Sequence, residues 1–222
     1  MAWSLTDIQT QISSEIDGNA SISSTSSEWG ARLAPINRSL FDWGDSYDWS
    51  QLKKIHNGAI STATGNASYA LPADFKRTIG YVKVAYDSQE DFPINPPEWN
   101  YRYTDTDRYV NILANDYDNK VLFIHGVTLS SGTSIQFTYF ASPISLSSTG
   151  QLTECPDPTF LVQRTLYYIY KSREDARFPE AKVEADKILA RMIENENTKG
   201  LGYVDRSVPV TPLVSFRIGR DG

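Results

Sequence analysis

The stretch SSGTSIQFTYFA, residues 130–141, decides the fold class of this 222-residue chain. It opens on the turn-forming residues Ser-Ser-Gly and then alternates, so that Ile135, Phe137 and Tyr139 fall on one side. Period-two alternation of apolar and polar residues predicts a half-buried β-strand over residues 133–141. A sheet, and not helices alone, is therefore expected in this protein.

Similar strand patterns recur upstream, separated by turn residues at intervals of roughly ten positions. The first two are joined by Thr64-Gly65-Asn66, which predicts that they pair as a hairpin. Residues 87–97 are dense in Asp and Pro and are expected to form a loop. The regular spacing favours an antiparallel meander or sandwich. The expected strands lie at residues 54–64, 67–71, 78–86, 108–114 and 120–125, the last two around a turn at 115–119.

Helical periodicity precedes this β region. A helix is predicted over residues 4–16. Ser4 is its cap, Asp7 three residues later completes a weak capping box, and Gly18 is the expected terminator. A second helix is predicted from Ser27, after a linker rich in Ser and Thr. Pro35 lies inside it, which predicts a break or a kink at that point.

Helices return after the β region, at about residues 158–177 and again from Pro179 to about residue 197. Their apolar positions recur at helical spacing and predict one buried face on each. The first stripe holds Val162, Leu166 and Ile169, and the second holds Ala181, Ala185, Ile188, Leu189 and Met192.

A different pattern follows residue 200, since every even position from 208 to 218 is apolar. This strict alternation predicts an extended segment. Two interpretations are open: it completes the chain's own sheet, or it adds to a partner protein.

The order of elements predicts an α+β chain with segregated helices and strands. We expect an N-terminal helical part (1–48) and an antiparallel β domain (49–150). C-terminal helices (151–200) are expected to pack on the N-terminal ones, and an extended C-terminal tail (201–222) follows.

Composition and charge narrow the classes of function that are expected. The net charge is −6 and no large basic cluster is present, so tight nucleic-acid binding is not expected. The single cysteine excludes an internal disulfide and fits a reducing cytosol or an assembly built there. The N-terminus has no signal-peptide pattern, and no apolar run is long enough to span a membrane.

No catalytic, cofactor or metal site is expected, because the short motifs typical of phosphate binding and of hydrolases are missing from the sequence. His56 and His125 lie far apart without metal-ligand spacing. Cys155 has no histidine near it in sequence to act as a base. Turn formation explains the aspartate groups, which are Asp42/Asp45/Asp48, Asp105/Asp107 and Asp116/Asp118. A non-enzymatic protein is the resulting prediction.

Three short segments carry a resemblance to a known family. They are Trp49-Ser-Gln-Leu52, Thr64-Gly-Asn66 and Tyr69-Ala-Leu-Pro-Ala-Asp-Phe-Lys-Arg77. With the strands and the proline-flanked helix that follow them, they resemble the head-to-tail adaptors (connectors) of tailed bacteriophages, related to podovirus tail tubular protein A. The similarity of pattern covers roughly residues 1–200.

The resemblance implies a structural protein of the virion neck. By this resemblance, the chain is expected to form a ring of twelve copies between the portal protein and a downstream neck or tail protein. Genomic DNA is then expected to pass through the lumen without specific binding, and no membrane is involved. The resemblance also places the C-terminal tail against the portal, with predicted portal-binding residues Val208, Val210, Pro212, Val214, Phe216, Arg217 and Ile218.

Two alternatives stay open. The chain's 13 Tyr, 9 Phe and 5 Trp residues, with its scattered aspartates, also suit a tail-associated module that binds or cleaves carbohydrate. In that case Trp49 or Trp99 is the expected sugar contact. Another neck component, such as a tail terminator, is the second alternative, and it differs from an adaptor in ring stoichiometry.

Overall fold

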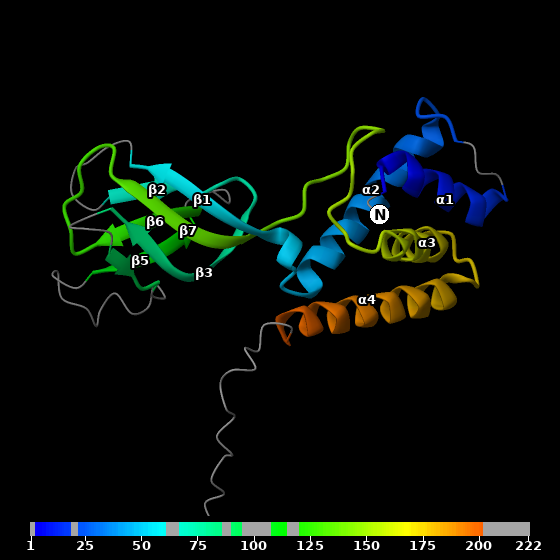
Figure 1. The fold of residues 1–222 in the computed structure, drawn as a ribbon. Helices are drawn as coiled ribbons and strands as arrows, with labels where there is room; N and C mark the ends of the chain where they lie inside the picture. The colour runs from blue at the N-terminus through cyan, green and yellow to red at the C-terminus, as the bar shows by residue number, and fades with distance from the viewer. Residues whose placement is uncertain are drawn as a thin grey trace, which may run out of the picture.

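The computed structural model describes residues 3–18, 22–60, 67–85, 90–94, 108–114 and 120–201, which form two lobes (Figure 1). The helical lobe contains α1 (Leu5–Asp17), α2 (Ser27–Ser46), α3 (Thr159–Ser172) and α4 (Phe178–Leu201). The β lobe contains the seven described strands. The chain enters the β lobe from α2, through the short 3-10 turn η1 (Ser50–Leu52), and returns from β7 to α3.

The first helix begins and ends as its sequence predicts. The Ser4 hydroxyl accepts a hydrogen bond from the Asp7 N–H at 3.2 Å, and the Asp7 carboxylate accepts one from the Ser4 N–H at 2.8 Å. This reciprocal capping box satisfies amide groups that no helical carbonyl can reach. Gly18 closes α1 with a φ of 66°, the left-handed conformation that glycine adopts without steric cost.

The second helix corrects two expectations. Its N-cap is Ser26, one residue earlier than predicted, and it runs without a break through Pro35. A break at Pro35 is therefore wrong, whereas a kink there stays a prediction. Buried residues on both sides of the proline hold the helix in place, because Trp29 packs before it and Ile36 and Leu40 pack after it.

The third helix ends at Ser172, five residues before the predicted end. Glu174 adopts a φ of 54°, which a helix cannot contain. Asp175 then accepts the Arg177 N–H at 2.9 Å, and α4 begins at Phe178. Pro179 is consequently the second residue of α4, where its missing N–H costs no helical hydrogen bond.

One apolar core joins all four helices and confirms both C-terminal stripes. Its helical members are fully or almost fully buried, and Leu189 packs against them from a partly buried position. They include Leu5, Ile8, Ile12, Trp29, Ile36, Leu40, Val162, Leu166, Ile169, Ala181, Ala185, Ile188 and Met192.

The β lobe is a sandwich of two antiparallel sheets. The first has the order β1-β7-β3-β4, and the second has the order β2-β6-β5. The bounds are β1 Lys53–Ala59, β2 Ala67–Ala70, β3 Phe75–Val84, β4 Glu90–Phe92, β5 Tyr109–Ala114, β6 Lys120–His125 and β7 Ser134–Ala141. β4 lies inside the region expected to be a loop, so that expectation is wrong for these three residues.

The alternation in β7 is confirmed, since Ile135, Phe137 and Tyr139 are all buried between the sheets. The hairpin between β5 and β6 is also confirmed, although its turn lies outside the described residues. The hairpin predicted between the first two strands is wrong. β1 pairs along its whole length with β7, and β2 pairs with β6 in the other sheet, because both strands find longer-range partners that share the apolar core.

Candidate functional site

The predicted portal-binding residues, from Val208 to Ile218, lie outside the described residues. The structure does describe where the tail begins, because α4 ends at Leu201. That end of α4 lies beside the corner at which α2 gives way to η1 and the β lobe (Figure 1). This corner is the first candidate site.

The corner holds α4 through hydrogen bonds from two residues, Tyr47 and Ser50, and Lys199 of α4 itself adds a third donor. The Glu196 carboxylate accepts the Ser50 N–H at 2.9 Å and the Lys199 ammonium at 2.9 Å. One residue further on, the Asn197 side-chain oxygen accepts the Tyr47 hydroxyl. The last turns of α4 are therefore tied to the start of the β lobe.

Two tryptophans form the interior of the corner. Trp43 and Trp49 are fully buried and stack with their ring centroids 5.4 Å apart. The Trp49 indole N–H also donates to the Trp43 carbonyl at 2.7 Å, near the end of α2. Because Trp49 has no exposed face, it cannot be the sugar contact of the carbohydrate alternative, and Trp99 lies outside the described residues.

Replacing Glu196 by glutamine is expected to lower the free energy of unfolding by about 1 kcal/mol at pH 7. Burial opposes the charge on Glu196, but the hydrogen bonds from Ser50 and Lys199 outweigh it and hold its pKa below the usual value. A lowered folded-state pKa gives stability that is present above the unfolded pKa and is lost as the pH falls through the folded one. Urea unfolding at pH 7 and at pH 3 checks this, since the difference from the unmodified protein should be smaller at pH 3 than at pH 7.

The first aspartate group connects elements instead of forming turns. Asp45, in α2, pairs with the Lys76 ammonium at 2.7 Å, and Asp48 pairs with the Arg77 guanidinium. Both bases come from β3, so these pairs bridge the two lobes. The turn explanation is wrong here, because Asp45 lies within a helix and both aspartates pair with bases of a distant strand.

Asp42, the third member of the group, acts within the helical lobe. Its carboxylate accepts the Arg164 guanidinium at 2.8 Å and the Tyr168 hydroxyl, both from α3. Burial and this hydrogen bond raise the pKa of Tyr168. The other aspartate groups lie outside the described residues.

A further cluster of polar side chains joins β1 and β7 of the β lobe to Asp74, just before β3. Asp74 accepts the Lys54 ammonium at 2.8 Å and the Tyr139 hydroxyl at 3.0 Å. Burial disfavours the charge on Asp74, but the two donors prevail and lower its pKa. Burial, and the hydrogen bond to Asp74, raise the pKa of Tyr139 to about 12. Near pH 7 the Asp74 carboxylate therefore stays charged and the Tyr139 hydroxyl stays neutral, which suits a structural contact.

The remaining sequence candidates stand apart from one another. His56 bonds the Tyr69 hydroxyl at 2.6 Å, while His125 stacks on Tyr109 at 4.5 Å and burial lowers its pKa. Cys155 is buried in the helical core, where burial raises the pKa of its thiol. Within the described ranges, no group of three or more His, Cys, Asp or Glu side chains converges as metal ligands would.

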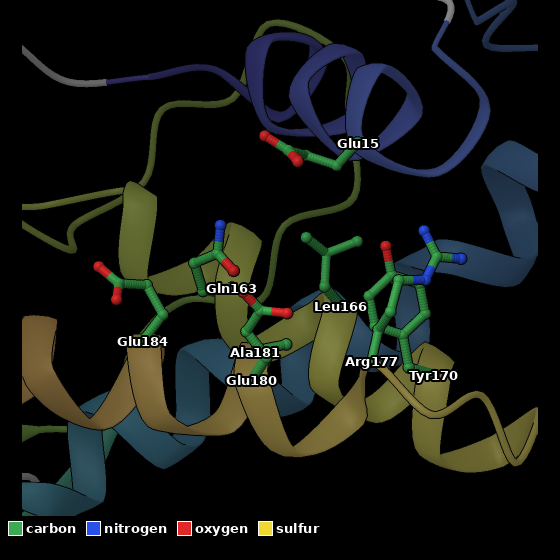
Figure 2. A pocket seen from close by; sticks show the side chains of 8 residues that line it. All are labelled: Glu15, Gln163, Leu166, Tyr170, Arg177, Glu180, Ala181 and Glu184. Carbon is green, nitrogen blue, oxygen red and sulfur yellow. The ribbon is translucent and has the colours of Figure 1, made fainter.

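Two surface hollows in the helical lobe form the second candidate site. The acidic hollow, of about 370 Å³, lies between α1, α3 and α4 (Figure 2). Figure 2 shows Glu15 above it on α1, and Glu180 and Glu184 below it on α4. Its floor is apolar, because it includes Leu166 and Ala181.

Arg177 also lines the acidic hollow, but its charge is already compensated. It pairs with Asp175 at 2.7 Å and lies over the Tyr170 ring at 4.3 Å. Among the residues that the structure describes, Glu15 and Glu180 have no ion-pair partner, whereas Glu184 lies 3.5 Å from the Lys187 ammonium.

The basic hollow, of about 520 Å³, lies between α2 and α3. Its cations are Arg38, which lies over the Tyr168 ring at 4.3 Å, and Lys171, which bonds the Tyr167 hydroxyl at 3.2 Å. Neither of them has an ion-pair partner in the part of the chain that the structure describes. Ala34 and Pro35 supply its apolar wall.

A comparison with family models identifies the family of this chain. The model of the SU10 adaptor protein family matches residues 4–212, nearly the whole chain. The chain belongs to the SU10 adaptor protein family. Membership confirms the resemblance to phage head-to-tail adaptors and gives the protein a structural role in a bacteriophage. No curated protein matches the chain. None of the described helices is long and apolar enough to cross a membrane.

Sequence reasoning missed the corner and both hollows. Each is built from segments that are far apart in the chain, such as Ser50 with Glu196, or Glu15 with Glu180. One local signal was available: Glu180 and Glu184 are four residues apart, which places two like charges on one helix face. Such a pair is unfavourable unless solvent or a partner compensates it.

Proposed function

We propose that this SU10 adaptor forms a closed ring, of twelve copies, that joins the portal to a downstream neck or tail protein and continues the DNA channel. The observation that carries the proposal is the family match over residues 4–212. The two-lobe architecture supports it, because the helical lobe suits a ring wall and the β lobe can extend toward a neighbouring component. Two chain connections and the ion pairs of Asp45 and Asp48 keep the lobes together.

The tail is proposed to bind the portal through the alternating residues 208–218. An extended apolar-polar alternation can add to the sheet edge of another protein or lie in its groove. The corner supports this role, because it fixes the end of α4 from which the tail departs. The residues proposed to contact the portal are Val208, Val210, Pro212, Val214, Phe216, Arg217 and Ile218.

The genome is proposed to pass through the lumen without specific binding, in a ring located in the virion neck and assembled in the host cytoplasm. The net charge of −6 supports this, because an acidic lumen repels DNA phosphates and lets the DNA slide. A strongly basic lumen in the assembled ring would contradict it.

Deleting residues 202–222 is expected to abolish binding to the portal while leaving the fold intact, because α4 ends at Leu201. The measurement is negative-stain imaging of the protein mixed with the portal of the same phage. The full chain should give rings stacked on portals, and the truncated chain should not. A Val214→Asp, Phe216→Asp double variant keeps the tail length and should fail in the same way.

The outcome that overturns the proposal is a full-length particle that forms no ring and ignores the portal. Screening for glycan binding would then follow. Stacking that survives both the truncation and the double variant would keep the adaptor function and remove the tail from the contact.

A further inference from the structure

The two hollows lie on opposite sides of one helix. Gln163, Leu166 and Tyr170 of α3 line the acidic hollow, whereas Tyr168 and Lys171 line the basic one. At 3.6 residues per turn, the two sets point roughly 140° apart around the helix axis. A single copy therefore presents the acidic hollow on one flank of the helical lobe and the basic hollow on the other.

A head-to-tail ring needs this arrangement. Each copy must offer two different surfaces, because a heterologous contact joins one patch of a subunit to another patch of its neighbour. The two patches must also complement each other. A pair of identical surfaces would instead produce a two-fold dimer that does not continue into a ring.

The charges of the hollows are complementary. The acidic hollow carries Glu15, Glu180 and Glu184, and the basic hollow carries Arg38 and Lys171, which lack an ion-pair partner among the described residues. Complementary potentials across an interface steer association and fix its register. Charges left uncompensated within one copy are thus available to the next.

An apolar component accompanies the charges. Phe41 lies one turn beyond Arg38 on the same side of α2 and is 39% exposed. The floor of the acidic hollow is formed by Leu166 and Ala181. Interfaces combine an apolar centre with a polar rim. The exposed ring of Phe41 supplies an apolar group beside the basic hollow, whereas Leu166 and Ala181 are almost fully buried within the copy.

We propose that the flank with the acidic hollow of each copy packs against the flank with the basic hollow of the next copy in the ring. Glu15, Glu180 and Glu184 face Arg38 and Lys171 across each subunit boundary. This assignment rests on the proposed ring function and names the surfaces by which the ring closes. The occupant of each hollow is a second copy of this chain, not the portal.

The test reverses the charges of one flank at a time. An Arg38→Glu, Lys171→Glu variant and a Glu180→Lys, Glu184→Lys variant each place like charges on both sides of every boundary. Association in each variant should weaken at least about tenfold, because like charges in contact oppose binding. Native mass spectrometry of the full chain, alone and with the portal, measures the ring population. Circular dichroism verifies that each variant is folded.

Mixing the two variants gives the decisive result. The unaltered acidic hollow of the first variant meets the unaltered basic hollow of the second, and the two reversed hollows also attract each other. An equimolar mixture should therefore restore rings in which the variants alternate, in equal numbers. A chain carrying all four reversals should also form rings.

A control variant, Lys83→Glu with Lys182→Glu, changes the net charge by the same amount as the basic-flank variant. Lys83 is an exposed residue of β3, and Lys182 lies on the side of α4 away from the acidic hollow. Its rings should match those of the unmodified protein, and rings of the unmodified protein should weaken as salt rises.

The outcomes separate the two proposals. If the unmodified chain forms rings and both reversals do so equally well, the assignment of the hollows is wrong and the ring function stands. The assignment is also wrong if the reversals keep the ring but lose the portal, or if the mixture fails to recover rings. If the unmodified chain forms no ring alone or on the portal, the ring function itself fails, and the assignment fails with it.

Discussion

Replacing Gly44 by alanine is expected to lower the free energy of unfolding by about 2–3 kcal/mol. A Cβ atom at this position of α2 would lie 2.3 Å from Pro143 Cγ and 2.6 Å from Pro143 Cδ. A proline ring cannot rotate away as a flexible side chain can, so the backbone must shift. Pro143 belongs to the segment that returns from β7 to α3, and the shift would therefore strain the second connection between the lobes. Urea unfolding monitored by tryptophan fluorescence measures the change.

Gly30 provides the matched control, because it lies in the same helix. A Cβ atom on Gly30 meets nothing within 4 Å. Alanine there should raise the free energy of unfolding by about 0.5–1 kcal/mol, since it restricts the unfolded chain and favours the helix. Equal effects of the two substitutions, in either direction, would show that the contact between Gly44 and Pro143 does not constrain the fold.

Local signals predicted the elements of this fold well. The capping box of Ser4 and Asp7, the terminating Gly18 and the alternation in β7 each depend on neighbours within a few residues. Such signals can be read from the local sequence without knowing which distant segments pack against it. The class of the fold followed from them, because the order of helices and strands is read directly from the sequence.

Long-range partners were not predictable in the same way. The turn signal at 64–66 indicates where the chain reverses, but it does not say which strand β1 pairs with, and β7 lies far along the sequence. Pro35 lowers the intrinsic stability of α2, yet the burial of Trp29 and Ile36 overrides that cost. The same limit applies to the aspartates, whose bases Lys76, Arg77 and Arg164 come from other elements.

The candidate sites show this limit most clearly. An isolated Glu196 in a charged helix looks like an ordinary solvent-exposed residue, and only the folded chain brings the Ser50 N–H to it. The hollows need three helices and two helices respectively, so no single segment encodes them. Surfaces that bind another copy are harder still, because their groups stay unpaired within one chain.

Replacing Trp49 by alanine is expected to cost about 3–5 kcal/mol of unfolding free energy, the largest effect predicted for this protein. The side chain is fully buried, stacks on Trp43 and donates to the Trp43 carbonyl. Its loss leaves a cavity and removes one of two hydrogen bonds to the Trp43 carbonyl, which the Ser46 hydroxyl also donates to at 2.7 Å. The adjacent Ser50 should then move away from Glu196 and release the end of α4. Hydrogen exchange should therefore accelerate at residues 194–199 as well as around the corner.

A Trp49→Phe variant separates packing from hydrogen bonding at the corner. Phenylalanine keeps an aromatic ring against Trp43 but removes the indole N–H, so its cost should be smaller, at roughly 1–3 kcal/mol. Exchange at residues 194–199 should then stay close to that of the unmodified protein, because the Ser50 contact with Glu196 is preserved. If the alanine variant is strongly destabilised but exchange at the end of α4 rises only as much as in the α3 helix, α4 is not anchored by this corner. The tail would then depart from a helix end that is held by its apolar face alone.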